Sequence, residues 1–199
     1  MQISATDLGC VRSGREVFAK VNFSVESGEA LVVLGRNGAG KSSLLRMIAG
    51  LIRIAAGRLA LDGGDPELTL PEQAHYLGHL DPVKPSLTVA ENLAFWTAYL
   101  GGAPESRALA TVGLDAIADL PAAYLSAGQR RRLSIARLIA VPRPVWLLDE
   151  PTSALDVPAQ VRLTEVMRQH RAGGGIILAA THGPVGLEAA KELRLGEAA

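Results

Sequence analysis

A glycine-rich segment near the start of the chain has residue types and spacing suited to holding phosphate. It reads Gly35-Arg36-Asn37-Gly38-Ala39-Gly40-Lys41-Ser42, with Ser43 directly after it. Glycines at this spacing let backbone N–H groups turn inward around phosphate oxygens, and the positive end of a following helix adds to the attraction. The pattern G-x-x-x-x-G-K-S therefore predicts a P-loop, in which Lys41 reaches the β- and γ-phosphates of ATP and Ser42 places its hydroxyl on Mg²⁺.

Two adjacent carboxylates could supply the acidic part of the same site. Asp149 and Glu150 directly follow the apolar run 145–148. Open α/β sheets bind ligands beyond the carboxyl ends of their strands. We therefore expect Asp149 to hold Mg²⁺ through its water shell and Glu150 to orient or deprotonate the attacking water. Taken alone, the pair is also compatible with an acidic turn that caps a strand, and the P-loop favours the catalytic interpretation.

His182 follows the next apolar run, Ile176 to Ala180. A single histidine in such a place more often has a structural role. Together with Glu150 it becomes a candidate to contact the γ-phosphate and stabilise charge in the transition state.

The elements that must position these residues can be predicted from the hydrophobic pattern. Ala30 to Leu34 is a continuous apolar run, typical of a strand buried on both faces, and it leads into the P-loop and a helix from about Ser42. With the two later apolar runs, it predicts a parallel α/β core. Weak alternation from Gln2 to Val25, around a turn at Gly14, indicates a short antiparallel sheet, and Gly57 to Leu61 is predicted to form another strand.

The middle of the chain is predicted to be helical. Residues from about Thr88 to Gly113 have apolar faces, interrupted by Gly101-Gly102-Ala103-Pro104. We expect residues 1–199 to form a single domain with a small helical subdomain at about 80–140. The residues after Leu195 are expected to fray.

Composition limits the classes of partner. The chain has 199 residues, of which 48% are hydrophobic and 20% charged, as in globular proteins. Twenty Lys and Arg residues balance twenty Asp and Glu residues, so no net field attracts nucleic acid, which we do not expect as a partner. The single cysteine, Cys10, is interpreted as a small buried hydrophobic residue. The first residues do not resemble a secretory signal and no apolar run approaches ~20 residues, so we expect a cytoplasmic protein. If it serves a membrane, it does so from outside the bilayer.

A second motif carries a family resemblance. Leu125-Ser126-Ala127-Gly128-Gln129 and the helix after it closely resemble the LSGGQ signature of ABC transporter ATP-binding proteins. The resemblance implies a P-loop NTPase (RecA-like) core with an ABC-type antiparallel β subdomain and a small helical subdomain. It also implies that a second copy binds head-to-tail, so that two ATP molecules are sandwiched between each P-loop and the partner's Ser126, Gly128 and Gln129. Asp156 resembles the D-loop residue that crosses this interface. We interpret Arg130 to Arg132 as a solvated basic helix face rather than a nucleic-acid site.

The sequence departs from the usual ABC pattern at two positions. The position of the Q-loop glutamine, which reads Mg²⁺ and contacts the membrane partner, falls on His79. The position of the aromatic residue that stacks on adenine falls on Arg12, whose guanidinium can also stack on a base, and Phe18 is an alternative.

Within the ABC superfamily, the sequence is similar to the haem-exporter ATP-binding proteins of cytochrome c maturation, the CcmA type. The chain length of 199 residues fits this type. The residues that carry the resemblance are Gly78-His79, the segment Glu91-Asn92-Leu93-Ala94-Phe95, the Ala127 variant of the signature with its triple arginine Arg130 to Arg132, and Trp146 to Glu150. The resemblance implies an ATP-hydrolysing subunit at the cytoplasmic face of the bacterial inner membrane, bound to integral membrane permease subunits and acting in haem export or haem-chaperone release. An exporter subunit with another cargo, and a nucleotide-gated module with little turnover, remain alternatives.

Overall fold

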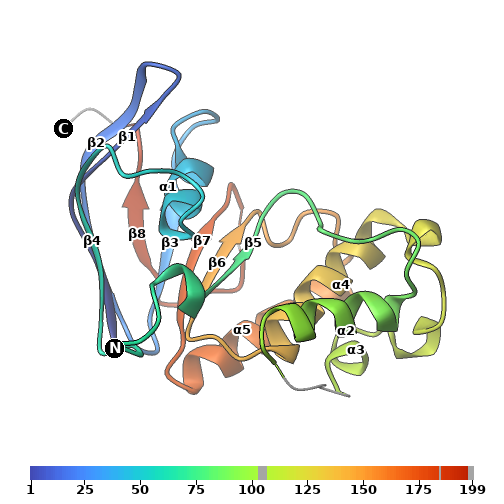
Figure 1. The fold of residues 1–199 in the computed structure, drawn as a ribbon. Coiled ribbons are helices and arrows are strands. Elements are labelled where there is room, and N and C mark those ends of the chain that lie inside the picture. The colour runs from blue at the N-terminus through green and yellow to red at the C-terminus, as the bar shows by residue number, and fades with distance from the viewer. Residues whose placement is uncertain (103–106, 184, 197–199) are drawn as a thin grey trace. The chain divides into compact units, whose positions relative to one another are not determined.

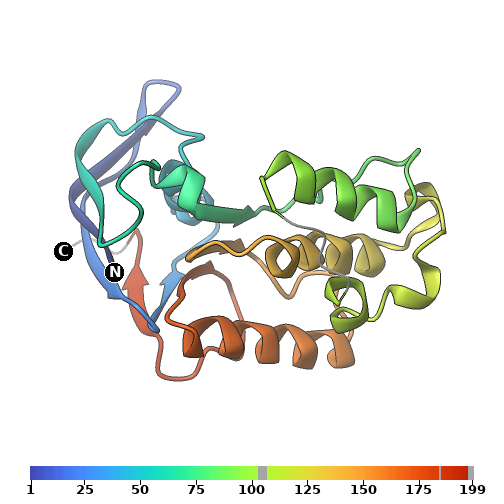
Figure 2. The same ribbon diagram turned by 60° about the horizontal axis from the view of Figure 1, so that its bottom comes forward.

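The computed structural model describes residues 1–102, 107–183 and 185–196. The chain divides into two compact units (Figures 1 and 2). The first unit comprises Met1–Gly78, Pro144–Pro151 and Arg168–Ala199, and the second comprises His79–Arg143 and Thr152–Met167. Two residues of the predicted break, Ala103 and Pro104, and residues 197–199 of the tail that was expected to fray lie outside the described residues.

The first unit contains an antiparallel sheet of three strands in the order β2-β1-β4. These strands are β1 (Gln2–Arg12), β2 (Arg15–Glu26) and β4 (Ala56–Asp62). Ser13 and Gly14 join β1 to β2 with φ angles of 49° and 75°, the left-handed pair that matches the twist of a two-residue hairpin. The predicted antiparallel sheet and the turn at Gly14 are therefore confirmed.

The first unit also contains a parallel sheet of five strands in the order β5-β6-β7-β3-β8. Three of them were predicted: β3 (Ala30–Leu34), β6 (Val145–Asp149) and β7 (Ile176–Ala180). Every residue of β6 and β7 is buried, as the continuous apolar runs indicated. The outer strands β5 (Ala74–Leu77) and β8 (Lys191–Arg194) were not predicted, because four residues are too few to show a pattern.

One hydrophobic core joins the two sheets of this unit. Helix α1 (Lys41–Ile48) lies between them, and its buried Leu44, Leu45 and Ile48 pack in one cluster with residues of both sheets (Figure 1). Cys10 is fully buried in this cluster, as expected, and burial raises the pKa of its thiol above the ordinary value. This core fixes α1 against the ends of the parallel strands, which is where the P-loop begins.

The second unit is built from helices. It contains α2 (Val89–Tyr99), α3 (Ala108–Thr111), α4 (Ala127–Ala140) and the part of α5 (Val157–Ala172) up to Met167. Thr88 begins α2 through a capping box with Glu91, which satisfies backbone groups that have no partner within the helix. None of the helices in the described ranges is long and apolar enough to cross a membrane. The single domain and the subdomain limits of about 80–140 stay predictions.

The interpretation of Arg130 to Arg132 as a solvated basic face is wrong for Arg131, which is buried, while Arg130 and Arg132 are half-buried. Arg131 is 2% exposed and forms an ion pair with Asp81, at 3.3 Å between Nη1 and Oδ1. Arg130 donates to the carbonyl oxygen of Leu125, and Arg132 donates to the carbonyl oxygens of Val112 and Gly113. The charges were visible in the sequence, but the carbonyls within reach of the long guanidinium groups depend on the tertiary fold.

A stacked pair of rings packs the parallel sheet of the first unit against the end of α5. Trp146 lies face to face with His170, with ring centroids 3.9 Å apart and planes 9° apart. Burial lowers the pKa of His170 to about 4 from its ordinary 6.5. The folded chain therefore keeps this imidazole neutral at pH values where the unfolded chain would protonate it.

This difference predicts a pH-dependent contribution to stability. As the pH falls from 6.5 to about 4, His170 takes up a proton in the unfolded state but stays neutral in the folded state, so the free energy of unfolding decreases. A His170→Phe variant keeps a flat ring on Trp146 and cannot titrate. Between about pH 7 and about pH 4.5 it should lose about 1 to 2 kcal/mol less stability than the parent, allowing for partial solvent screening. Urea unfolding at both pH values measures this, and an equal loss in the two proteins would contradict it.

Candidate active site

One open pocket in the first unit collects the predicted phosphate-binding and acidic residues. It has a volume of about 630 Å³. The β1–β2 hairpin, the P-loop with the start of α1, and the segments after β6 and β7 all contribute to its wall. Its lining residues are Arg12, Ser13, Val17, Asn37, Gly38, Gly40, Lys41, Ser42, Ser43, Asp149, Glu150 and His182. The parallel sheet explains this meeting, because parallel strands present their carboxyl ends at a common edge.

The P-loop depends on glycine where it enters α1. Gly40 is the N-cap residue of α1 and has φ of 100°, a left-handed conformation that L side chains rarely adopt. A Cβ atom at Gly40 would lie 2.6 Å from Val17 Cγ1 and 2.9 Å from Phe18 Cδ1. Strand β2 therefore packs directly against the loop at this point, and leaves no room for a side chain.

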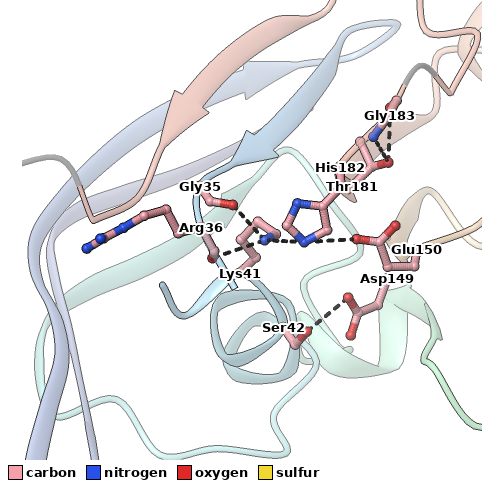
Figure 3. A network of polar contacts seen from close by, with 9 residues as sticks. All are labelled: Gly35, Arg36, Lys41, Ser42, Asp149, Glu150, Thr181, His182 and Gly183. Carbon is pink, nitrogen blue, oxygen red and sulfur yellow. Dashed lines mark hydrogen bonds and ion pairs between the residues drawn. The ribbon is translucent and has the colours of Figure 1, made fainter. Parts of the chain in front are cut away.

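Lys41 is 7% exposed, and protein acceptors surround its ammonium group (Figure 3). Nζ donates to the carbonyl oxygen of Gly35 at 2.8 Å and to that of Arg36 at 3.3 Å, and it lies 3.0 Å from Nε2 of His182. An ammonium group has no acceptor, so the facing imidazole nitrogen accepts. A phosphate that approaches Lys41 has to replace at least some of these contacts.

Ser42 and Asp149 bring two oxygen atoms that could bind a metal ion close together in the pocket (Figure 3). Ser42 Oγ donates to Asp149 Oδ1 at 3.0 Å, and Asp149 is 3% exposed. A hydroxyl and a carboxylate are the hard oxygen ligands that Mg²⁺ prefers, so this pair fits the predicted metal. Among the described residues no three His, Cys, Asp or Glu side chains gather as a metal cage. A magnesium site does not require such a cage, because Mg²⁺ usually takes most of its ligands from phosphate and water.

Glu150 and His182 face each other above this pair. Their Oε1 and Nε2 atoms lie 3.7 Å apart, and the side chains are 32% and 50% exposed, so both can reach a ligand in the pocket (Figure 3). Glu150 has φ of 48°, and its backbone N–H donates to the carbonyl oxygen of Ala180 at 2.9 Å. Left-handed backbone is uncommon for a residue other than glycine, and such outliers gather at functional sites.

Another part of the pocket contains the residues that were expected near the adenine base of ATP. Arg12, at the end of β1, is exposed and lines the pocket together with Val17. Phe18, the alternative stacking residue, is 7% exposed and packs in the core beneath Gly40. Arg12 therefore stays the predicted stacking residue, because the ring of Phe18 is already packed in the core.

The signature and D-loop residues belong to the second unit. Ser126 caps α4: its Oγ accepts from the Gln129 N–H at 3.2 Å, and Gln129 Oε1 accepts from the Ser126 N–H at 2.8 Å. Asp156 Oδ1 accepts from the Ala159 N–H at 2.9 Å, at the start of α5. A Cβ atom at Gly128 would lie 2.7 Å from the carbonyl oxygen of Ala154, so these two segments pack closely. Their predicted contact with a partner's nucleotide stays a prediction.

His79 is the first residue of the second unit and is exposed. Its predicted role at the Mg²⁺ site and the membrane partner therefore stays a prediction as well.

Two residues next to the site were missed. The Tyr76 hydroxyl donates to Asp149 Oδ2 at 3.2 Å and accepts from Arg46 Nε at 3.1 Å. The available signal was the spacing of Ser42 and Arg46, four apart on a helix that starts at the P-loop. Tyr76 itself gave no signal, since it lies in the short strand β5.

Comparison with known proteins identifies the family. The sequence profile of the family described as ABC transporter matches residues 18–153. The chain belongs to the ABC transporter family. The predicted fold class, an α/β P-loop core with an antiparallel sheet, is thereby confirmed, as is the assignment as an ATP-binding ATPase that hydrolyses ATP.

Relatives place the chain among ABC proteins of the CcmA type. It is 66% identical to the cytochrome c biogenesis ATP-binding export protein CcmA of Nitrobacter winogradskyi, over 100% of both chains. Identity to the protein of the same name is 61% in Bradyrhizobium diazoefficiens, over 98% of both chains, and 49% in Agrobacterium fabrum, over 98% of this chain and 95% of that one.

Solved structures agree on the fold. An ATP-binding subunit of an ABC transporter superposes with a TM-score of 0.88 at 26% identity, covering 98% of this chain and 86% of that one. A putative ABC transporter ATP-binding protein from Pyrococcus furiosus gives a TM-score of 0.84 over 98% of both chains. Its identity is 20%, so it supports the fold alone.

The geometry at Gly40 predicts the effect of adding a single methyl group. Gly40→Ala should lower the free energy of unfolding by about 2 to 3 kcal/mol, because a left-handed backbone and contact with Val17 and Phe18 act together. Gly174→Ala is a matched control, since Gly174 has φ of 85° and nothing within 4 Å of the added atom. It should cost about 1 kcal/mol. Urea unfolding of both variants makes the comparison, and equal losses would show that packing of β2 on the loop is unimportant.

Proposed function

We propose that this chain is the ATP-hydrolysing subunit of a membrane complex in cytochrome c biogenesis, where it drives haem export or the release of a haem chaperone. The convergence of Lys41, Ser42, Asp149, Glu150 and His182 on one pocket carries this proposal. The relatives that are 66% and 61% identical over nearly all of their length bear a name that includes cytochrome c biogenesis and export.

Six residues of the pocket have a task in nucleotide binding or hydrolysis. Lys41 exchanges carbonyl oxygens for those of the β- and γ-phosphates, and Ser42 with Asp149 holds Mg²⁺. When bound, Mg²⁺ offsets the charge of the phosphates. Glu150 orients the attacking water and accepts its proton, and His182 contacts the γ-phosphate and stabilises charge there. Arg12 stacks on the base through its guanidinium plane.

A second copy of the chain completes the site in this proposal. The N-terminus of α4 attracts anions, while its own protomer already has a P-loop for the nucleotide. The hydroxyl of Ser126 accepts from Gln129 and can still donate its own proton to a phosphate oxygen. We therefore assign Ser126, Gly128 and Gln129 to the γ-phosphate of the partner's nucleotide in a head-to-tail dimer, with Asp156 at the interface.

The membrane partners are proposed to be integral permease subunits at the cytoplasmic face of the inner membrane, contacted through the segment of His79. An ATPase can move a cargo across a bilayer only when it is joined to a component that spans the bilayer. Co-purification of such subunits with the tagged chain from its native membrane would identify them, and would separate haem export from another cargo.

The Glu150→Gln variant tests the catalytic assignment. Because the amide keeps the shape of the side chain and loses its basicity, the variant should bind MgATP with parental affinity and lose at least about 100-fold in phosphate release. The trapped nucleotide should stabilise the dimer, as measured by light scattering. Glu29→Gln, whose side chain is paired with Lys191 on the surface, is the control and should keep full activity. Parental turnover in Glu150→Gln would contradict the role of Glu150.

The head-to-tail dimer can be tested separately by crosslinking. Asn37 and Ser126 are both exposed, so cysteines placed there are accessible to a short bismaleimide once Cys10 is replaced by serine. In the Glu150→Gln background, MgATP should produce a double-crosslinked dimer, and omission of nucleotide should not. The control carries Asn37→Cys with Tyr99→Cys in place of Ser126→Cys. Tyr99 is also an exposed residue of the second unit, and this pair should not crosslink. Failure to crosslink Asn37 to Ser126 with MgATP bound would rule out this arrangement.

A further inference from the structure

The Asp149 carboxylate is held at both of its oxygens by different elements. Oδ1 accepts from Ser42 in α1, and Oδ2 accepts from the hydroxyl of Tyr76 in β5. Asp149 is 3% exposed, so protein groups rather than bulk water set the rotation of its carboxylate. Tyr76 itself is not one of the residues that line the pocket.

The direction of the hydrogen bonds through Tyr76 follows from the chemistry of its neighbours. Arg46 Nε lies 3.1 Å from the Tyr76 oxygen, and a guanidinium only donates. Tyr76 therefore accepts from Arg46 and gives its single proton to Asp149 Oδ2. Burial raises the pKa of Tyr76 above its ordinary value. The hydrogen bond to Tyr76 in turn raises the pKa of Arg46, whose charge is permanent.

The fold closes these contacts into a ring. Ser42 and Arg46 are four residues apart on α1 and so lie on one side of the helix. In the parallel pairing of β5 and β6, Tyr76 is the partner of Leu147, and Asp149 follows two residues later on the same face. The helix thus reaches Asp149 twice, directly through Ser42 and indirectly through Arg46 and Tyr76.

We propose that Tyr76, supported by Arg46, is a positioning residue that holds Asp149 Oδ1 toward Ser42 and so preorganises this oxygen pair for a divalent cation. This inference rests on the proposed function, since it takes Asp149 as the metal-binding carboxylate. Tyr76 acts only through Asp149. Without its hydroxyl, Oδ2 loses a donor and the carboxylate can turn away from Ser42. Groups that orient a ligand in this way typically change metal affinity by about 10–100-fold when mutated.

Mn²⁺ is a suitable probe, because its binding to the complete chain with ATP can be followed by electron paramagnetic resonance. Tyr76→Phe removes one oxygen and keeps the ring. We expect it to weaken Mn²⁺ binding about tenfold, and to leave the affinity for ATP measured in EDTA within about twofold of the parent, since that affinity needs no metal. A purely structural role would weaken both. Tyr99→Phe removes the same hydroxyl from a side chain of α2 that is 72% exposed, and should change neither.

Further variants distinguish the possible failures. If Asp149→Asn weakens Mn²⁺ binding and Tyr76→Phe binds Mn²⁺ like the parent, the positioning role of Tyr76 is wrong and the proposed metal site stands. If Asp149→Asn also binds like the parent, the metal site of the proposed function is itself wrong. Should Tyr76→Phe not fold by circular dichroism, Arg46→Gln replaces it with an expected loss of about threefold or more. Parental Mn²⁺ affinity in that variant then overturns the inference.

Discussion

The hydrogen bond between Ser42 and Asp149 joins the two halves of the catalytic apparatus. It connects the first turn of α1 to the last residue of β6, and so fixes the position of the phosphate-binding loop relative to the acidic segment. This relative position depends on the parallel sheet, in which β6 lies beside β7 and β7 lies beside β3. Strands that run in one direction deliver Lys41, Asp149 and His182 to one edge, although 107 residues separate Ser42 from Asp149.

Protein groups satisfy the hydrogen bonds of two buried charged side chains in this site. Lys41 and Asp149 are 7% and 3% exposed, and an unpartnered ion at such depth would be costly. Carbonyl oxygens and His182 satisfy Lys41, while Ser42 and Tyr76 satisfy Asp149. At these two side chains, a nucleotide and its metal therefore gain affinity by exchanging the present partners for better ones. Phosphate oxygens with full negative charge are better partners for an ammonium group than peptide carbonyls, because charge-assisted hydrogen bonds are stronger.

The sequence was most informative where a local pattern determines the structure. The apolar runs of β3, β6 and β7 were recognised because strands buried on both faces need continuous hydrophobic residues. The four-residue strands β5 and β8 lack such a signal, and with β5 the role of Tyr76 was missed. The arginines of α4 were misjudged for a related reason: Asp81 lies 50 residues before Arg131, and only the fold brings them together. The candidate site was accessible from sequence because its residues follow strand ends directly. The contacts that orient those residues were not, because they come from distant elements.

Several residues with proposed roles in binding also begin a helix of the fold. Ser126 caps α4, Asp156 caps α5, and Gly40 begins α1. Capping aligns the first N–H groups of a helix in the direction that attracts an anion, so the same residue stabilises the helix and prepares it for phosphate. A substitution at such a position changes stability and binding together. Tyr76 differs in this respect, because it lies behind Asp149 and caps nothing, which makes its hydroxyl the cleaner probe of how orientation of the carboxylate alone contributes to binding.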